Sequence, residues 1–269
     1  KGGMVLDLGW VITLFVMGSI GSFISGMIGI GGSIINYPML LYIPPLLGFA
    51  AFTAHEVSTV NAVQVFFATL AGMFAYRKDG FIHKKLVIAM GIPIVAGSFI
   101  GGYGSKYLPD SGINLTYAFM ALIAAIMMLM PKNATDKADC SDVRFNPAVA
   151  VMAAAAVGLL SGIVGAAGAF MTIPIMLVVL KIPTRVAIAS SLAITFISSI
   201  GTAVGKAMGG HMLLIPSLVM VAASIIASPL GARLGKKMNV KALQWILTAL
   251  ITATVMKIWA DILMESRSV

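Results

Sequence analysis

The sequence predicts an all-α polytopic membrane protein built from two inverted-topology repeats. Three observations lead to this fold class: an apolar composition, a series of long stretches without charged residues, and a motif that occurs twice. Of 269 residues, 59% are hydrophobic and only 10% are charged, whereas soluble domains carry roughly 25% charged residues. The mean hydropathy is +1.02. This composition excludes a cytosolic enzyme and predicts helices that cross a bilayer.

Ten apolar segments follow one another along the chain. A helix that spans a bilayer needs about 20 apolar residues, and most of the uncharged stretches reach that length. A polar linker at 132–146 separates five segments from five, which predicts a first membrane repeat (1–131), a cytoplasmic linker and a second, inverted repeat (147–269). The predicted segments are 9–27, 33–47, 53–76, 85–105, 112–131, 147–165, 168–181, 185–207, 212–234 and 242–263.

Basic residues gather in alternate loops, and this pattern orients the chain. With both termini outside, the inner loops hold 13 of the 18 Lys and Arg residues. Cytoplasmic loops carry such an excess, so we expect both termini to be extracellular. The same bias accounts for the formal net charge of +9 without a nucleic-acid partner. Because Cys140 is the single cysteine, we expect no internal disulfide, metal cluster or other cofactor.

A glycine-rich motif occurs once in each half. The stretch SGMIGIGGSIINYPMLL (25–41) aligns without a gap onto SGIVGAAGAFMTIPIML (161–177), an offset of 136. A weaker match at offset 130 pairs SFIGGYGSKYL (98–108) with SPLGARLGKKM (228–238). Because each half contains five segments, the second half would run with the opposite topology. Inverted repeats are typical of transporters, whose substrates bind near the midplane.

The glycines of the motif predict broken helices. Four glycines fall within residues 26–32, and each destabilises a helix by up to about 1 kcal/mol. Such backbone is tolerated within a membrane where it is buried in protein or lines a wet cavity. The half-helices that would begin near 31–33 and 167–169 expose N–H groups that attract anions. Segments 1–2 and 6–7 either span fully or form re-entrant hairpins, and close helix packing is the alternative role of the glycines.

These motifs resemble those of the TauE/SafE family of sulfite exporter-like permeases. The resemblance covers essentially the whole chain and rests on two motif copies of the form G-x-x-G-x-G-G…P, a small polar patch in the following helix, and a later GG/LGARLG segment. It implies a plasma-membrane carrier for small sulfur-containing anions such as sulfite or organosulfonates. The second copy departs from the pattern, because Ala167 and Ala169 stand opposite Gly31 and Ser33.

Uncharged donors at the broken helices and on neighbouring segments make up the expected anion site. Polar groups inside a membrane need partners, although a Ser or Thr hydroxyl often bonds a carbonyl of its own helix. His55 and Glu56 are candidates for proton coupling, for an interfacial salt bridge or for a solvated helix cap. Lys106, Lys206 and Arg233 either attract an anion toward the pore or reach the interface by snorkelling, and we expect snorkelling. The predicted substrate-binding residues are Gly29, Gly31, Gly32, Ser33, Asn36, Ser58, Thr59, Asn61, Gly165, Ala167, Gly168, Thr172, Ser190, Ser191 and Thr195.

The sequence thus predicts a secondary transporter and not an enzyme. Two repeats working by alternating access would carry the anion, and a passive anion or small-solute channel built on the broken-helix tips is the alternative. An enzyme within the membrane would need paired catalytic groups or metal ligands inside the spans, and the three histidines all fall at segment ends. The expected partners are a small sulfur anion and the lipid bilayer, and the sequence leaves a homodimer open.

Overall fold

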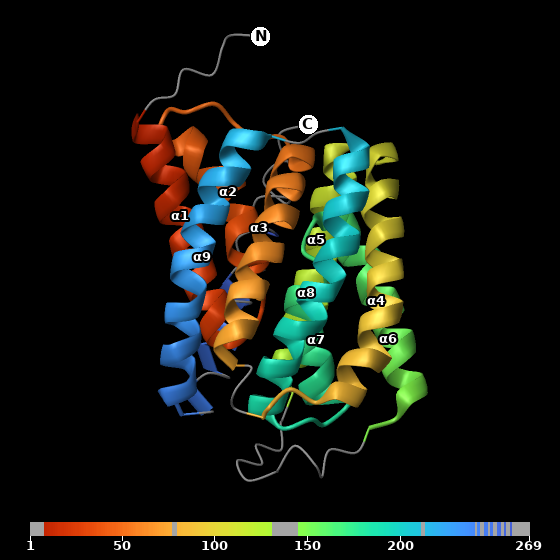
Figure 1. Ribbon diagram of the computed structural model, residues 1–269. Coiled ribbons are helices and arrows are strands. Elements are labelled where there is room, and N and C mark those ends of the chain that lie inside the picture. The colour runs from red at the N-terminus through yellow and green to blue at the C-terminus, as the bar shows by residue number, and fades with distance from the viewer. Residues whose placement is uncertain are drawn as a thin grey trace.

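A computed structural model shows the chain as an all-helical bundle (Figure 1). It describes residues 8–76, 80–130, 145–210 and 213–239, together with single positions between 241 and 259. Within these residues, seven helices are long and apolar enough to cross a membrane. The predicted all-α, multi-pass membrane protein is confirmed at this level.

Each of the first nine predicted segments corresponds to one helix, or to one helix and its continuation, within three residues at either end. The tenth segment lies mostly outside the described residues. The first half contains α1 (Leu8–Ile28), α2 (Ser33–Leu46), α3 (Ala54–Tyr76), α4 (Lys84–Gly104), the 3-10 turn η1 (Ser105–Tyr107) and α5 (Asp110–Leu129). The second half contains α6 (Pro147–Val164), α7 (Ala169–Pro174), the π-helical turn η3 (Ile175–Val179), α8 (Thr184–Gly209) and α9 (Leu214–Lys237).

Two helical hairpins return to the end of the bundle at which they begin. In Figure 1, α1 begins and α2 ends at the upper end, whereas α6 begins and η3 ends at the lower end. The helices α2 and α7 are also too short to cross a membrane. This arrangement agrees with the re-entrant option that the sequence leaves open.

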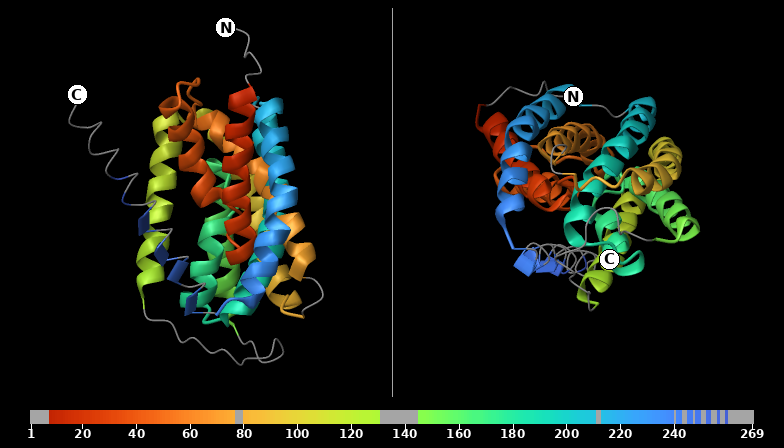
Figure 2. Two further views of the ribbon diagram at one scale, coloured as in Figure 1. Left: turned by 90° about the vertical axis from the view of Figure 1, so that its left-hand side faces the viewer. Right: turned by 60° about the horizontal axis from the view of Figure 1, so that its bottom comes forward.

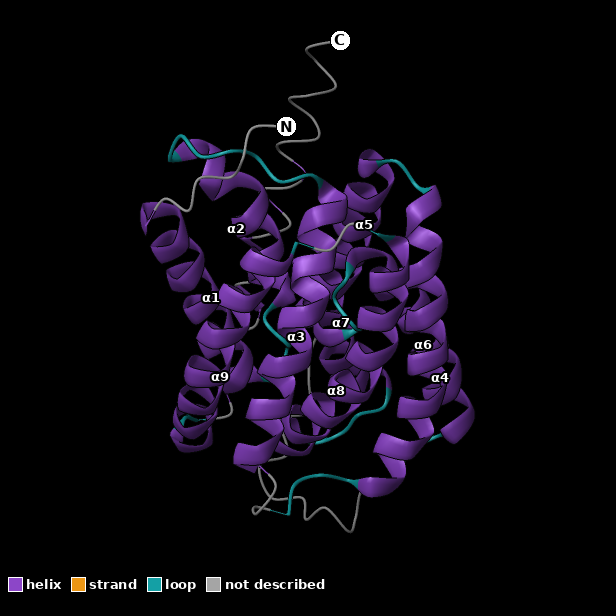
Figure 3. Ribbon diagram, turned by 45° about the horizontal axis from the view of Figure 1, so that its top comes forward, coloured by secondary structure: helices purple, strands orange, loops and turns teal. Residues whose placement is uncertain are grey.

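The helices α3 and α8 occupy the middle of the bundle. They lie between the pair α1–α9 and the pair α4–α6, as the second view of Figure 2 shows. In α8, 78% of the most apolar stretch is buried, followed by 61% in α3. Only helices make up these layers, and the described ranges contain no strand (Figure 3). Each half therefore supplies one central helix.

Glycines allow close packing within the two outer pairs. A Cβ added to Gly231 of α9 would lie 1.8 Å from the carbonyl oxygen of Phe23 in α1. A Cβ on Gly101 of α4 would lie 1.9 Å from the carbonyl oxygen of Leu159 in α6. Backbones this close leave no room for a side chain, as is common between membrane helices. Helix packing is therefore the role of these later glycines.

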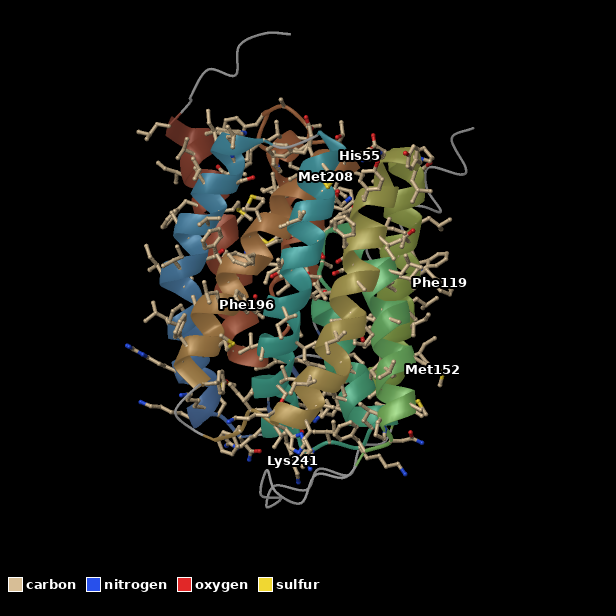
Figure 4. The ribbon with its side chains drawn as sticks, turned by 45° about the vertical axis from the view of Figure 1, so that its right-hand side comes forward. His55, Phe119, Met152, Phe196, Met208 and Lys241 are labelled. Carbon is tan, nitrogen blue, oxygen red and sulfur yellow. The ribbon has the colours of Figure 1, made fainter. Side chains whose placement is uncertain are left out.

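Apolar side chains cover the outer surface, and basic residues gather at one end. Phe119 and Met152 are 52% and 65% exposed, and Figure 4 shows both on the outside of the bundle. The lower end of Figure 1, where α4 and α8 begin and α9 ends, carries Lys84, Lys85, Lys181, Arg185, Arg233, Lys236, Lys237 and Lys241. Both termini and residues 132–144 of the linker lie outside the described residues, so their predicted orientation stays a prediction.

Candidate functional site

Two glycine-rich turns, tip 1 (residues 29–32) and tip 2 (residues 165–168), interrupt the helical hairpins. In tip 1 the φ angles of Gly29, Gly31 and Gly32 are 84°, 68° and 77°. In tip 2 those of Gly165, Ala167 and Gly168 are 78°, 51° and 75°. Glycine adopts this left-handed backbone without steric strain. The second helices begin at Ser33 and Ala169, so the predicted helix breaks are confirmed.

Each tip touches the central helix of the other half. A Cβ on Gly29 would lie 2.8 Å from the carbonyl oxygen of Ile188 in α8, and one on Gly165 would lie 1.8 Å from that of Ser58 in α3. The Ser191 hydroxyl also donates to the carbonyl of Gly29 at 2.8 Å. The fold therefore brings Ser191 to tip 1 and Ser58 to tip 2.

Buried polar groups without partners surround tip 1. The hydroxyls of Ser25 and Ser33 and both amide atoms of Asn36 are buried and have no hydrogen-bond partner among the described residues. Asn36 reaches the tip, since a Cβ on Gly32 would lie 3.3 Å from its Nδ2 and one on Gly21 would lie 1.8 Å from its Oδ1. Leaving such groups unpaired costs free energy. An occupant that hydrogen-bonds them, such as water or a ligand, would remove this cost.

Further unpartnered groups lie on the two central helices. Within the described part of the chain, Asn61, the Oε1 atom of Gln64 and the Thr195 hydroxyl are buried without a partner. Gln64 donates through Nε2 to the Ser22 hydroxyl at 2.7 Å. Ser22 in turn shares a 2.7 Å hydrogen bond with Ser224 of α9. This network, which the sequence did not reveal, joins α3 and α9 to the face of α1 that leads toward tip 1.

The polar side chains near tip 2 are satisfied locally. Thr172 donates to the carbonyl of Gly168 at 2.6 Å, and Ser161 donates to a carbonyl of its own helix at 3.2 Å. Ser58 and Thr59 both donate to the same carbonyl one turn earlier in α3, at 2.8 and 2.9 Å. Such bonds are the usual way in which a helix accommodates a hydroxyl.

Three predicted residues have other contacts. The Ser190 hydroxyl accepts from the backbone N–H of His83 at 3.0 Å. Glu56 accepts from the N–H of Thr53 at 2.9 Å while the Thr53 hydroxyl accepts from the N–H of Glu56 at 3.2 Å. This pair is a capping box that begins α3, and His55 lies beside it at the upper end of the bundle (Figure 4). The contacts fit the helix-cap option, and proton coupling stays a prediction.

One buried cation contradicts the expectation from sequence. Lys206 is only 3% exposed, and its Nζ donates to Ser58 at 2.7 Å, to Ser105 at 2.8 Å and to the carbonyl of Ile163 at 2.6 Å. The prediction that Lys206 snorkels to the interface is wrong, because these bonds hold the amine inside the bundle. The signal in the sequence is its position within the predicted segment 185–207 and not beside it.

Comparison with known proteins identifies the chain's family. A family model described as sulfite exporter TauE/SafE matches residues 14–258. The chain belongs to the TauE/SafE family. It is 27% identical over 252 residues to the probable membrane transporter protein YunE of Bacillus subtilis, covering 88% of this chain and 92% of that protein. Both tips and Lys206 lie within the stretch that matches the TauE/SafE model.

A second relative comes from another organism. A probable membrane transporter protein of Methanocaldococcus jannaschii is 26% identical over 250 residues, which cover 90% of this chain and 91% of that protein. No solved structure gives a significant match. The family and the multi-pass fold together make this TauE/SafE protein a membrane transporter and not an enzyme.

Proposed function

We propose that this transporter is a secondary carrier for small sulfur-containing anions such as sulfite or organosulfonates. The observation that carries the proposal is the set of unpartnered groups at tip 1, from Ser25, Ser33 and Asn36. Their O–H and N–H groups can donate to the several oxygens of an oxyanion. The start of α2 lies among them, and the positive end of its helix dipole adds attraction for negative charge.

We further propose that the two halves are inverted repeats. A Cβ on Gly26 of α1 would lie 1.9 Å from the carbonyl oxygen of Ser228 in α9, and one on Gly162 of α6 would lie 2.4 Å from that of Ser98 in α4. The two glycines are 136 positions apart and the two serines 130, which are the offsets found in the sequence. The contact of Gly29 with Ile188 and that of Gly165 with Ser58 are related in the same way, with the glycines 136 positions apart and the central-helix residues 130. A two-fold axis would exchange all these contacts.

Alternating access would follow from movement of one half against the other. The halves meet along α3–α8 and also along α1–α9, α4–α6, α4–α8 and α3–α9, and each tip rests on the central helix of the other half. A shift at the contacts between the tips and the central helices would open the tip-1 donors to one side of the membrane and then to the other. In this scheme the repeats are 1–131 and 147–269, the linker 132–146 is cytoplasmic, and both termini face outward from the plasma membrane.

Counterflow of radiolabelled sulfite in proteoliposomes tests the carrier. Ser25 and Ser161 form a matched pair, because they stand at equivalent positions and only the Ser25 hydroxyl is unpartnered. We expect saturable uptake that unlabelled sulfite on the opposite side accelerates. Ser25→Ala should raise the half-saturation concentration about 10-fold, since a hydrogen bond to a charged group contributes about 1.5–3 kcal/mol. Ser161→Ala should leave it nearly unchanged.

The other outcomes of this experiment separate the alternatives. Uptake in proportion to the gradient, without counterflow, would identify a passive channel. Flux of an organosulfonate but not of sulfite would keep the mechanism and change the substrate. An equal response of the two serine variants would contradict the location of the site at tip 1.

A further inference from the structure

A buried lysine sits beside tip 2, where the two halves meet. Lys206 belongs to α8, and its three partners come from α3, η1 and α6. One partner, the carbonyl of Ile163, lies two residues before tip 2. Another, Ser58, has its own carbonyl packed against Gly165 of the tip. A single amine therefore links the first half of the chain to the second at the edge of this tip.

The hydrogen-bond partners of Lys206 are all oxygen acceptors. The Ser58 hydroxyl donates its proton to a carbonyl of α3 at 2.8 Å, and the Ser105 hydroxyl donates its proton to a carbonyl of α4 at 2.7 Å. Both oxygens are therefore acceptors toward Nζ, and the carbonyl of Ile163 is an acceptor as well. Three acceptors match the three N–H donors of the ammonium form. The arrangement therefore fits a positively charged Lys206.

This charge has no carboxylate partner among the residues that the structure describes. The described acids are Glu56 and Asp110, which accept hydrogen bonds from the backbone N–H groups of Thr53 and His55. A buried ionised group without a countercharge costs free energy even where hydrogen bonds satisfy it. Charged residues kept in spans despite such a cost commonly mark the path of a substrate or ion. An anion would supply the missing countercharge.

The position equivalent to Lys206 in the first half carries no charge. At the offset of 130 it is Tyr76, and the cation at this place, Lys236, comes from the second half and lies 5.0 Å from the Tyr76 ring centroid. Tip 2 also lacks the unpartnered donors of tip 1, because Thr172 and Ser161 bond carbonyls of their own helices. We propose that Lys206 is a charged pole on the anion path, apart from the neutral donors of tip 1, and that the transported anion takes over its ammonium beside tip 2. The inference rests on the proposed function, because the ligand is the same small anion.

Anion binding at Lys206 would act on the contact between the halves. The anion replaces a neutral acceptor, Ser58 or Ser105, with an ionised one, so that both partners of the hydrogen bond are charged. Both serines belong to the first half, whereas Lys206 belongs to the second. Their release from the ammonium loosens the two halves at the upper end of the bundle. Occupancy of the site is thereby linked to opening on that side.

Thermal unfolding of the detergent-solubilised full chain measures this binding without transport. A ligand that binds only the folded state stabilises it by RT ln(1 + [L]/Kd), so the shift against sulfite concentration gives a Kd. Lys206→Gln should weaken sulfite binding at least about 10-fold, because a charge-assisted bond is lost. Lys106→Gln is the matched control, since Lys106 is a partly exposed cation that lies 3.6 Å from the ring centroid of Tyr103 at the same end. This control should bind sulfite like the wild type.

Each result decides one of the two proposals. Equal sulfite affinity in the wild type and Lys206→Gln overturns the role of Lys206, while persistent counterflow keeps the carrier. Affinity that depends on Lys206 in a protein without flux supports the charged pole and overturns the carrier. If sulfite, sulfate, thiosulfate and an organosulfonate all fail to stabilise the wild type, both proposals are overturned. Lys206→Met, which removes the buried polar head, takes the place of Lys206→Gln if the latter does not fold.

Discussion

The two tips share a backbone and differ in how their polar groups are satisfied. Each contains three left-handed residues at identical spacing, and each packs against a carbonyl of a central helix. Beside tip 1, Asn36 has two unpartnered amide atoms. At the equivalent position beside tip 2, the Thr172 hydroxyl donates to the carbonyl of Gly168. The ammonium of Lys206 lies close to this tip, because it donates to the carbonyl of Ile163.

This difference separates what the fold requires from what the ligand requires. A left-handed turn against a neighbouring backbone needs glycine whatever the ligand is, so the glycine pattern repeats in both halves. The side chains around the turn are not bound by that requirement. Repetition in the sequence therefore locates the tips. The side chains around them place unpartnered neutral donors beside tip 1 and the charged Lys206 beside tip 2.

Gly165→Ala should have the largest effect, because it alters the backbone feature that the tips share. The new Cβ would lie 1.8 Å from the carbonyl oxygen of Ser58, and the φ angle of 78° adds strain of about 1–2 kcal/mol. We expect little folded protein in size-exclusion chromatography and no counterflow.

Gly48→Ala isolates the strain from the clash. Gly48 has a φ of 82° and nothing within 4 Å of an added Cβ, so this variant should fold and lose only a few degrees of unfolding temperature. If Gly165→Ala behaves like Gly48→Ala, tip 2 can shift away from α3, and the close docking of the two tips is not what holds the halves together.

Asn36→Leu and Thr172→Val sharpen the comparison, because they should change opposite properties. Asn36→Leu removes two unpartnered amide atoms at nearly constant shape, so stability without anion should be equal or higher. Its half-saturation concentration for sulfite should rise about 10-fold or more, because donors to a charged ligand are lost.

Thr172→Val should lower stability by about 0.5–1.5 kcal/mol through the lost bond to Gly168 and leave sulfite affinity unchanged. Thermal unfolding and counterflow measure both properties, and a Thr172→Val defect in affinity alone would reverse the assignment of the tips.

Most of the fold could be predicted from the sequence because its determinants are local. The length of an apolar stretch decides whether a helix can span a bilayer, and a cluster of glycines breaks a helix where it stands. The predicted segment 33–47 accordingly became α2, Ser33–Leu46. The sequence does not decide whether segments 1–2 and 6–7 span fully or form re-entrant hairpins, because both options place the charged loops on the same sides of the membrane.

The state of the site's polar groups depends on packing and could not be predicted in the same way. Ser25 and Ser161 both precede a glycine in matching motifs, yet only Ser161 bonds its own helix. Lys206 is buried by bonds to Ser58 and Ser105, which lie 148 and 101 positions away in the chain. No local pattern reports such contacts, although a lysine within a predicted span is a warning that one exists.

The smallest expected effect tests the one residue at which the two tips differ in backbone chemistry. Ala167 has a φ of 51° and stands opposite Gly31, whose φ is 68°. A left-handed alanine costs about 1–2 kcal/mol, part of which is offset because glycine gives the unfolded chain more freedom. Ala167→Gly should therefore raise the unfolding temperature by about 2 °C and leave sulfite affinity unchanged.

The neighbouring substitution Ala166→Gly should change the unfolding temperature in the opposite direction. Ala166 is buried and is not among the described residues with positive φ. Glycine there adds freedom to the unfolded chain and removes a buried methyl group, so it should lower the unfolding temperature. A higher unfolding temperature for Ala167→Gly together with a lower one for Ala166→Gly would show that Ala167 is strained in a backbone conformation that favours glycine. If both variants destabilise the protein equally, the methyl group of Ala167 fills space that tip 1 leaves open, and the tips differ in packing as well as in their polar groups.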